Sequence, residues 1–279
     1  MKYIFHILLL LIAGTLWGCS NDEDKEKRTV CPFEKQYPDV AQITISEIIS
    51  NDGGTVNKKE TYSFSDNRLV THITAQEFYG QSLSNEIKFA YSENMATLTD
   101  DAGNTATYIL GYNGYAHKCI YQMHSQTREY DFSYTYDFLT EIKEKIDGEL
   151  YSSVQLQYDD SGNLQTINTN GQKILCRVGD DMNIYNLPCI ALYDIYPLSF
   201  HIDAIYARIL GRQSSRFVTR TAPEGNEDEW TDYTYQIGEH DKLTKLTAST
   251  TSTGTVYDKY GTASEVTRTD TRVLNIQIE

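Results

Sequence analysis

Proline is scarce in this chain, and basic residues are outnumbered by acidic ones. Only five of the 279 residues are proline, and none lies inside the segments with the clearest two-residue alternation. Because proline cannot donate to a strand ladder, its scarcity there permits centrally paired strands. Lys and Arg total 24 against 39 Asp and Glu, a formal net charge of −15. This acidity argues against nucleic acid or an anionic lipid surface as the partner.

The chain also lacks the signatures of several enzyme and metal-site classes. It has no G-x-S-x-G elbow, no P-loop and no G-x-G-x-x-G, and no histidine lies in H-E-x-x-H or at zinc-ligand spacing from a cysteine. We therefore predict no catalytic residue, no cofactor and no metal ligand. The histidines after the first 19 residues are His72, His117, His124, His201 and His240.

Two acidic clusters, residues 100–104 and 159–163, come closest to a cation site. Each holds two aspartates, and Ca²⁺ prefers several oxygen ligands. Both lack the distal glutamate of an EF-hand and fall where hairpin turns are expected, so we predict turns. A pair of carboxylates for glycoside hydrolysis remains an alternative, because such a pair needs proximity in space and not in sequence.

One long apolar run is present, at the N-terminus. Lys2 precedes residues 4–12, which are almost unbroken apolar sequence but shorter than the ~20 residues that cross a bilayer as a helix. We predict a secretory signal over residues 1–18. The segment Leu16-Trp17-Gly18-Cys19 resembles a bacterial lipobox, which implies a lipid on Cys19, although Trp17 departs from the usual small residue. Ordinary cleavage without lipid is the alternative.

A polar tether, residues 19–39, follows the signal. Its acidic cluster resembles the surface-export signal of Bacteroidetes lipoproteins. The resemblance implies an outer-membrane lipoprotein exposed at the cell surface and held by its N-terminal lipid anchor, with the periplasmic side as the alternative.

Four cysteines remain after Cys19, and secretion permits disulfides among them. They are Cys31, Cys119, Cys176 and Cys189. Cys176 and Cys189 are close enough in sequence for a bridge that would contribute ~3 kcal/mol by closing a short loop. Buried free thiols are an equal alternative, so the pairing stays open.

From about residue 40 the dominant hydrophobic period is two, which is typical of strands. One predicted strand face is Tyr130, Phe132, Tyr134, Tyr136 and Phe138; others are Leu150, Val154, Leu156 and Tyr158; Tyr233, Tyr235 and Ile237; and Leu274, Ile276 and Ile278. Turn signals separate such runs, because Asn-Gly and Asp-Gly permit positive φ. They are at 51–54, 66–67, 113–114, 147–148, 170–171 and 252–254.

The predicted hairpins repeat. Residues 62–73, 156–167 and 233–246 each read as an aromatic strand, a polar turn and an apolar return strand. We predict an all-β domain over residues 40–279, an antiparallel meander of β-hairpins curling into a barrel-like sheet. The two-residue alternation is interrupted once, where apolar residues at helical spacing predict a short amphipathic helix near 199–210 with Gly211 at C′. We expect it to cap or plug one end of the sheet.

The hairpin units, best seen in Tyr-Asp-Asp-Ser-Gly-Asn-Leu at 158–164, resemble the YD repeats of Rhs-type surface proteins. The whole arrangement resembles a family of Bacteroidetes lipoproteins of unknown function with a porin-like β fold. That resemblance implies an architecture and no activity. A lipid-facing barrel fits less well, because the strand faces mix tyrosine with Lys, Glu and Asp.

Two functions follow. The first is a non-enzymatic binding or structural module of the cell envelope, whose 22 tyrosines could supply an aromatic platform for a glycan or a protein. The alternative is a glycan-acting hydrolase with two carboxyls ~5–9.5 Å apart. The lining of the largest concavity distinguishes the two.

Overall fold

The computed structural model describes residues 37–51, 54–123, 126–226, 228–257 and 260–279. The predicted signal peptide, Cys19, Cys31 and the tether up to residue 36 lie outside these residues.

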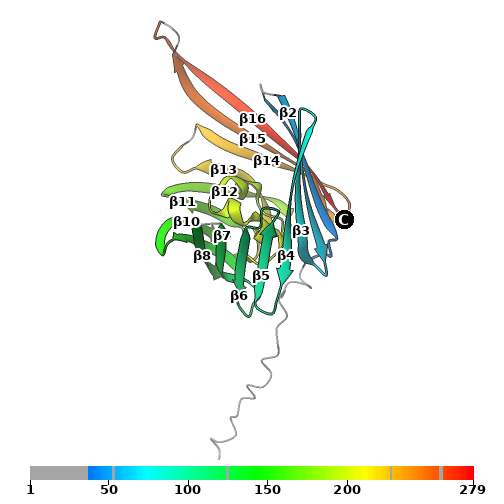
Figure 1. The fold of residues 1–279 in the computed structure, drawn as a ribbon. Coiled ribbons are helices and arrows are strands. Elements are labelled where there is room, and N and C mark those ends of the chain that lie inside the picture. The colour runs from blue at the N-terminus through cyan, green and yellow to red at the C-terminus, as the bar shows by residue number, and fades with distance from the viewer. Residues whose placement is uncertain (1–36, 52–53, 124–125, 227, 258–259) are drawn as a thin grey trace, which may run out of the picture.

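The described chain forms an antiparallel barrel in which each strand pairs with its neighbours in sequence and β1 pairs with β16 (Figure 1). This confirms the predicted meander of hairpins curling into a barrel-like sheet, and the pairing of β1 with β16 closes that barrel. The strands are β1 (Gln42–Asn51), β2 (Gly54–Ser65), β3 (Arg68–Phe78), β4 (Gln81–Tyr91), β5 (Met95–Asp100), β6 (Thr105–Leu110), β7 (Ala116–Met123), β8 (Gln126–Thr135), β9 (Phe138–Ile146), β10 (Glu149–Tyr158), β11 (Leu164–Thr169), β12 (Gln172–Met182), β13 (Arg216–Pro223), β14 (Glu229–Ile237), β15 (Leu243–Tyr257) and β16 (Ala263–Ile278).

The two-residue alternation separates the inside of the barrel from its outside. On β8, Tyr130 and Phe132 are buried in the interior, whereas Asp131 on the opposite face pairs with Lys145 of β9 at 2.7 Å. Successive strand residues point to opposite faces of a sheet, so one apolar set per strand is enough to build a shared core. The three predicted repeats are the hairpins β2–β3, β10–β11 and β14–β15.

The turns predicted at 66–67, 113–114, 147–148 and 170–171 are confirmed, whereas the one predicted at 51–54 includes residues 52 and 53, which lie outside the described residues. Asp147-Gly148 and Asn170-Gly171 both have positive φ at two successive residues, as the primed hairpin turns require. The turn predicted at 252–254 is wrong, since these residues lie within β15. There Thr253 on β15 faces Thr267 on β16 with their hydroxyls 3.1 Å apart, and cross-strand threonine pairs favour continued pairing.

The predicted strand face from Tyr130 to Phe138 is also wrong beyond residue 135. The chain reverses at Tyr136 and Asp137, with φ of +49° and +70°, and Phe138 begins β9. No glycine marks this turn, so the alternating aromatics concealed it. Tyr136 is consequently 90% exposed instead of sharing the buried face.

The segment between β12 and β13 folds into the barrel as a plug, residues 183–215 (Figure 1). It holds the short helices η2 (Ile190–Asp194), η3 (Leu198–His201) and α2 (Ile202–Tyr206); η4 (Glu239–Asp241) lies elsewhere, between β14 and β15. Figure 1 shows the plug helices surrounded by strands.

The predicted helix near 199–210 is therefore present but shorter, since η3 and α2 together run over residues 198–206. Arg208 has a φ of +61°, its N–H donates to the Ile205 carbonyl, and the Ile209 N–H donates to the Ala204 carbonyl. These two bonds define a Schellman motif with Arg208 at C′. The prediction that Gly211 is the C′ residue was wrong.

Side chains of the plug and of the inner wall form a continuous core. Ile205 and Leu198 of the plug are fully buried, as are Tyr62 and Tyr108 of the wall. Among the described residues, no helix has both the length and the apolar character needed to cross a membrane.

Candidate functional site

A depression of about 1070 Å³ lies on the outer wall and reaches the end of the barrel where β8 turns into β9. We call it the aromatic depression. Its lining comes from β8, β9 and β10, from the β8–β9 and β10–β11 turns, and from residues 212 and 215 at the end of the plug.

Aromatic rings and one cation form its floor. The rings of Phe138 and Tyr158 lie 4.7 Å apart between centroids, and the Arg212 guanidinium carbon lies 5.1 Å from the Phe138 centroid. The exposed Tyr136 is part of the same lining. Phe138 is only 8% exposed and Tyr158 is half-buried, so Tyr136 is the ring that this lining exposes to solvent, beside the positive charge of Arg212.

The end of the plug holds these turns in place. The Arg212 N–H donates to the Asp137 carbonyl at 2.8 Å, and the Ser215 N–H donates to the Gly162 carbonyl at 2.9 Å. Gly162 has a φ of +77°, and a Cβ there would lie 2.3 Å from the Phe138 ring. Only glycine thus allows Phe138 to pack over the β10–β11 turn.

The walls of the aromatic depression are polar and uncharged for much of their extent. Ser133 and Thr135 of β8 and Gln155 and Gln157 of β10 contribute hydroxyls and amides. Such groups both donate and accept hydrogen bonds, which suits a ligand with many hydroxyls.

Two carboxyls of the aromatic depression, those of Glu141 and Asp159, have lowered pKa values. Hydrogen bonds from Lys143 and Gln155 hold the pKa of Glu141 below its usual value. Hydrogen bonds from Asn163, followed by those from Ser161 and Gln165, lower the pKa of Asp159. The general acid of a glycosidase has a raised pKa, and neither Glu141 nor Asp159 does.

The two acidic clusters are turns, as predicted. In each, the aspartate accepts the N–H of the asparagine four residues on, at 2.8 Å for both Asp100–Asn104 and Asp159–Asn163. The same carboxylates accept the asparagine side-chain amides. Within the residues that the structure describes, no group of three or more His, Cys, Asp or Glu side chains is placed to hold a metal ion.

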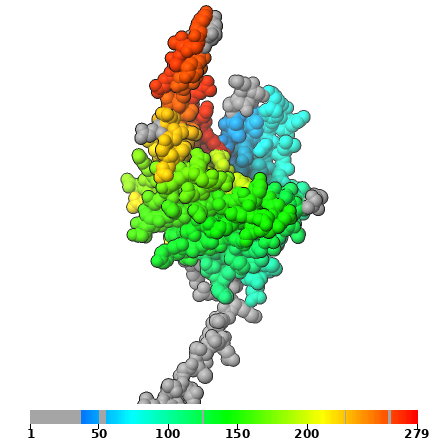
Figure 2. Space-filling view, turned by 90° about the vertical axis from the view of Figure 1, so that its left-hand side faces the viewer, coloured from blue at the N-terminus to red at the C-terminus, as the bar shows by residue number. Residues whose placement is uncertain are grey.

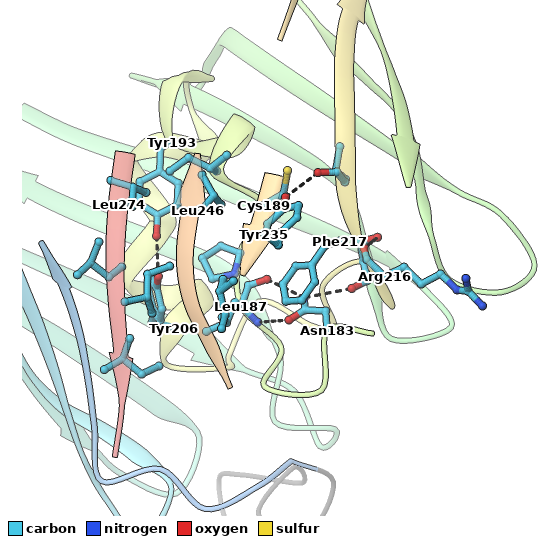
Figure 3. Close-up of a pocket in the computed structure, with 18 residues that line it drawn as sticks. Asn183, Leu187, Cys189, Tyr193, Tyr206, Arg216, Phe217, Tyr235, Leu246 and Leu274 are labelled. Carbon is cyan, nitrogen blue, oxygen red and sulfur yellow. Dashed lines mark hydrogen bonds between the residues drawn. The ribbon is translucent and has the colours of Figure 1, made fainter. Parts of the chain in front are cut away.

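A second cavity lies inside, between the plug and the wall formed by β14, β15, β16 and β1 (Figure 3). Its volume is about 30 Å³, room for roughly two water molecules. Figure 3 shows Tyr193 and Tyr206 meeting there, with their hydroxyls 2.7 Å apart. This cavity is too small for an organic ligand.

The buried ionisable groups of the interior are structural. Glu144, fully buried on β9, accepts hydrogen bonds from Tyr130 (3.1 Å), Ser152 (2.7 Å) and Tyr196, and pairs with Arg128 (3.1 Å). These contacts join three strands to the plug and satisfy the carboxylate.

Two histidines predicted as ordinary residues join the plug to the wall. His72 of β3 lies 2.8 Å from Asp203 of α2 and stacks on Tyr62 with ring centroids 4.1 Å apart. His201 receives or donates a 2.8 Å hydrogen bond with Tyr108, and burial lowers its pKa to about 3. Neither lies in a cavity that admits a ligand.

Cys176 on β12 and Cys189 on the plug are thiols in the structure, as is Cys119. Burial raises the pKa of Cys176, and it raises that of Cys189 to about 11. Both cysteines border the interior, and the disulfide between them stays a prediction. Mass spectrometry of the unreduced protein would test it.

A closed antiparallel barrel with an internal plug and a ligand-sized depression on its wall defines the class of this protein. The chain belongs to the family described as a domain of unknown function (DUF4595) with porin-like fold, whose model matches residues 60–245. This confirms the predicted family with a porin-like fold, whereas lipoprotein status and the likeness to YD repeats stay predictions.

Solved structures agree with this assignment. A porin-like protein from Bacteroides uniformis ATCC 8492 is 28% identical, with a TM-score of 0.74 over 87% of this chain and 99% of the other. Another from Bacteroides vulgatus ATCC 8482 is 11% identical, with a TM-score of 0.51 over 86% and 98%, and shows the fold alone. The search of curated proteins finds no match.

Sequence reasoning considered the turn at 159–163 only for a cation, and it named none of the other residues of the aromatic depression as a site. Tyr136 and Phe138 were assigned to one face of a single strand, and Arg212 had no motif. The one usable signal was Tyr136-Asp137, since Asp tolerates positive φ and could have marked a turn.

Proposed function

We propose that this chain is a non-enzymatic binding module of the bacterial cell envelope and that the aromatic depression binds an oligosaccharide. The observation that carries the proposal is the aromatic floor of Phe138, Tyr158 and Tyr136 beside Arg212, with hydroxyl and amide walls. Flat aromatic faces suit the apolar face of a sugar ring, and the polar walls suit its hydroxyls.

The outer wall supports a barrel that faces water. Ion pairs lie on the outer face of neighbouring strands, with Lys118 to Glu129 at 2.6 Å and Arg220 to Asp232 at 2.5 Å. A lipid-facing barrel needs an apolar band in such positions. These ion pairs support our proposal that the lipid on Cys19, and not the barrel, attaches the chain to the membrane, with the domain at the outer surface of the outer membrane.

Glycan binding is tested by calorimetry of the mature chain, residues 19–279, against a panel of soluble polysaccharides. Tyr136→Asn removes the exposed ring while keeping a residue that accepts positive φ. Tyr112→Asn is the matched control, because Tyr112 is also 90% exposed in a turn but lies outside the aromatic depression. We expect Tyr136→Asn to weaken binding by about tenfold, the loss of one aromatic contact.

Absence of binding to every glycan, or equal loss in both variants, would refute the site. Release of reducing ends during incubation would instead identify a hydrolase. Anchoring is tested separately by labelling cells with a fatty acid analogue, where Cys19→Ala must abolish the label. Added protease must then remove the domain from intact cells.

A further inference from the structure

The barrel wall is closed over only part of its height. The seam between β1 and β16 has five paired positions, from Ile43–Ile278 to Glu47–Leu274. Above Leu274, β16 continues for the residues 263–273, which pair with β15 on one side. On the other side they pair with no strand of the described chain. Figure 2 shows the β15–β16 hairpin projecting as a fin, separated by a notch from the β2–β4 side.

An ion pair marks the upper limit of the seam. The Arg272 guanidinium contacts the Glu47 carboxylate twice, Nε to Oε1 at 2.5 Å and Nη2 to Oε2 at 3.0 Å. Above Glu47, β1 pairs with β2 alone and reaches its end at Asn51. The residues that the structure describes therefore supply no further partner strand for the upper part of β16.

Every second residue of this free edge directs its backbone N–H and C=O groups away from β15. At the base of β16, the Glu279 N–H donates to the Gln42 carbonyl at 2.9 Å, and the Gln42 N–H donates back at 3.4 Å. In an antiparallel ladder this direction alternates, so odd-numbered residues of β16 direct N–H and C=O toward the β1 side. On the free stretch these include Thr267, Thr269 and Thr271. An unpaired row of this kind is a template for another strand.

The charges on the free edge are complementary to themselves. Arg268 and Asp270 are exposed, lie on one face of β16, and form no ion pair with another described residue. An antiparallel copy centred on Thr269 places Arg268 opposite Asp270 of the second chain, and Asp270 opposite its Arg268. These are non-hydrogen-bonded positions, where opposite side chains lie closest.

The alternative centres fail on charge. Pairing centred on Arg268 or on Asp270 uses the same odd-numbered backbone groups, but it places the central charge opposite its own copy at a non-hydrogen-bonded position, where opposite side chains lie closest. Centring on Thr269 satisfies the backbone and both charge pairs together.

We propose that the free edge of β16 binds a second copy of this chain, pairing antiparallel about Thr269 to form a two-fold dimer. The partner contributes the same edge, as a two-fold interface requires. The edge lies at the end of the barrel opposite the β8–β9 turn, so dimerisation leaves the aromatic depression open.

Sedimentation equilibrium of the mature chain tests this proposal through a charge swap. We expect the wild type to show a concentration-dependent dimer. Arg268→Asp and Asp270→Arg each place like charges opposite one another and should raise the dimer dissociation constant at least about tenfold. The double variant R268D/D270R restores both pairs and should return the constant to within a few-fold of wild type.

Asp180→Arg is the matched control, because Asp180 is fully exposed on β12, away from β16. It should leave the dimer unchanged. At a concentration where the wild type is monomeric, all variants should keep its thermal midpoint, since the changed side chains lie on the projecting part of the hairpin. A wild type that stays monomeric at every concentration refutes the dimer. A dimer that the single variants do not weaken, or that the swap does not restore, refutes this edge and register.

Discussion

Glu141 and Glu144 lie three positions apart on β9, yet they face opposite environments. Glu141 is on the outer face beside Lys143 and Gln155. Glu144 is inside, fully buried among Tyr130, Tyr196 and Arg128. A glutamate side chain is therefore a weakly stabilising surface group at position 141 and the centre of a buried network at position 144.

Replacing Glu144 by Ala should lower the free energy of unfolding by about 3–5 kcal/mol, because it leaves a partly buried Arg128 and two tyrosine hydroxyls without their acceptor. Urea denaturation followed by circular dichroism measures this. Glu141→Ala is the control and should cost less than ~1 kcal/mol. Equal losses would show that the network contributes nothing specific.

Two glycines in equivalent turns give a second comparison at the residue scale. Gly103 and Gly162 occupy the same position of the two acidic turns, with φ of +82° and +77°. A Cβ on Gly103 meets nothing within 4 Å, whereas one on Gly162 would clash with Phe138.

Both Gly→Ala variants bear the cost of positive φ, about 1–2 kcal/mol. Gly162→Ala should lose a further ~1–3 kcal/mol through the clash, seen as a lower urea midpoint than that of Gly103→Ala. Glycan binding should weaken only in the Gly162 variant, because Phe138 belongs to the aromatic depression. Equal midpoints would mean that Phe138 moves away freely.

At the scale of elements, hairpins with strong turn residues were predictable and the others were not. Asp147-Gly148 identifies a hairpin locally, because few other dipeptides accept two positive φ angles. Tyr136-Asp137 also turns with two positive φ angles, although neither residue is glycine. Thr253-Gly254, by contrast, continues a strand although it contains glycine. In both places the neighbouring strands decide the outcome.

The plug depends on its burial and not on helix propensity, because α2 has only five residues. Ile205→Ala should therefore cost about 2–5 kcal/mol, since Ile205 is 0% exposed in the filled barrel. Leu83→Ala, at a residue that is 69% exposed, should cost well under 1 kcal/mol. Thermal denaturation of both variants tests whether the plug is a required part of the core.

At the scale of the whole molecule, filling the barrel couples its stability to pH. His201 is enclosed by Tyr108, Tyr130, Phe132 and Phe200, and burial holds its pKa near 3. In the unfolded chain the ring takes up a proton near pH 6.5. The stability from the neutral ring is therefore complete above pH 6.5 and is lost as the pH falls toward 3.

Between pH 6.5 and 5 this one group should lower the free energy of unfolding by roughly 2 kcal/mol. The lowered pKa values of Glu141, Asp159 and Asp232 act in the same direction only at more acidic pH. NMR of the His201 ring should show no titration between pH 8 and 5 in the native protein, and ordinary titration in urea. A native ring titrating near 6.5 would contradict its enclosure.

The sequence by itself determined the all-β class, most hairpins and the existence of the helical plug segment, because alternation and turn chemistry are local properties. Tertiary structure alone decided that Tyr136 is exposed, that Arg212 stacks on Phe138 and that β16 extends beyond the part of it that pairs with β1. Each of these depends on which distant strands meet and where the seam ends. No local pattern encodes that, because the register of the closing pair is set by the packing of the whole barrel around its plug.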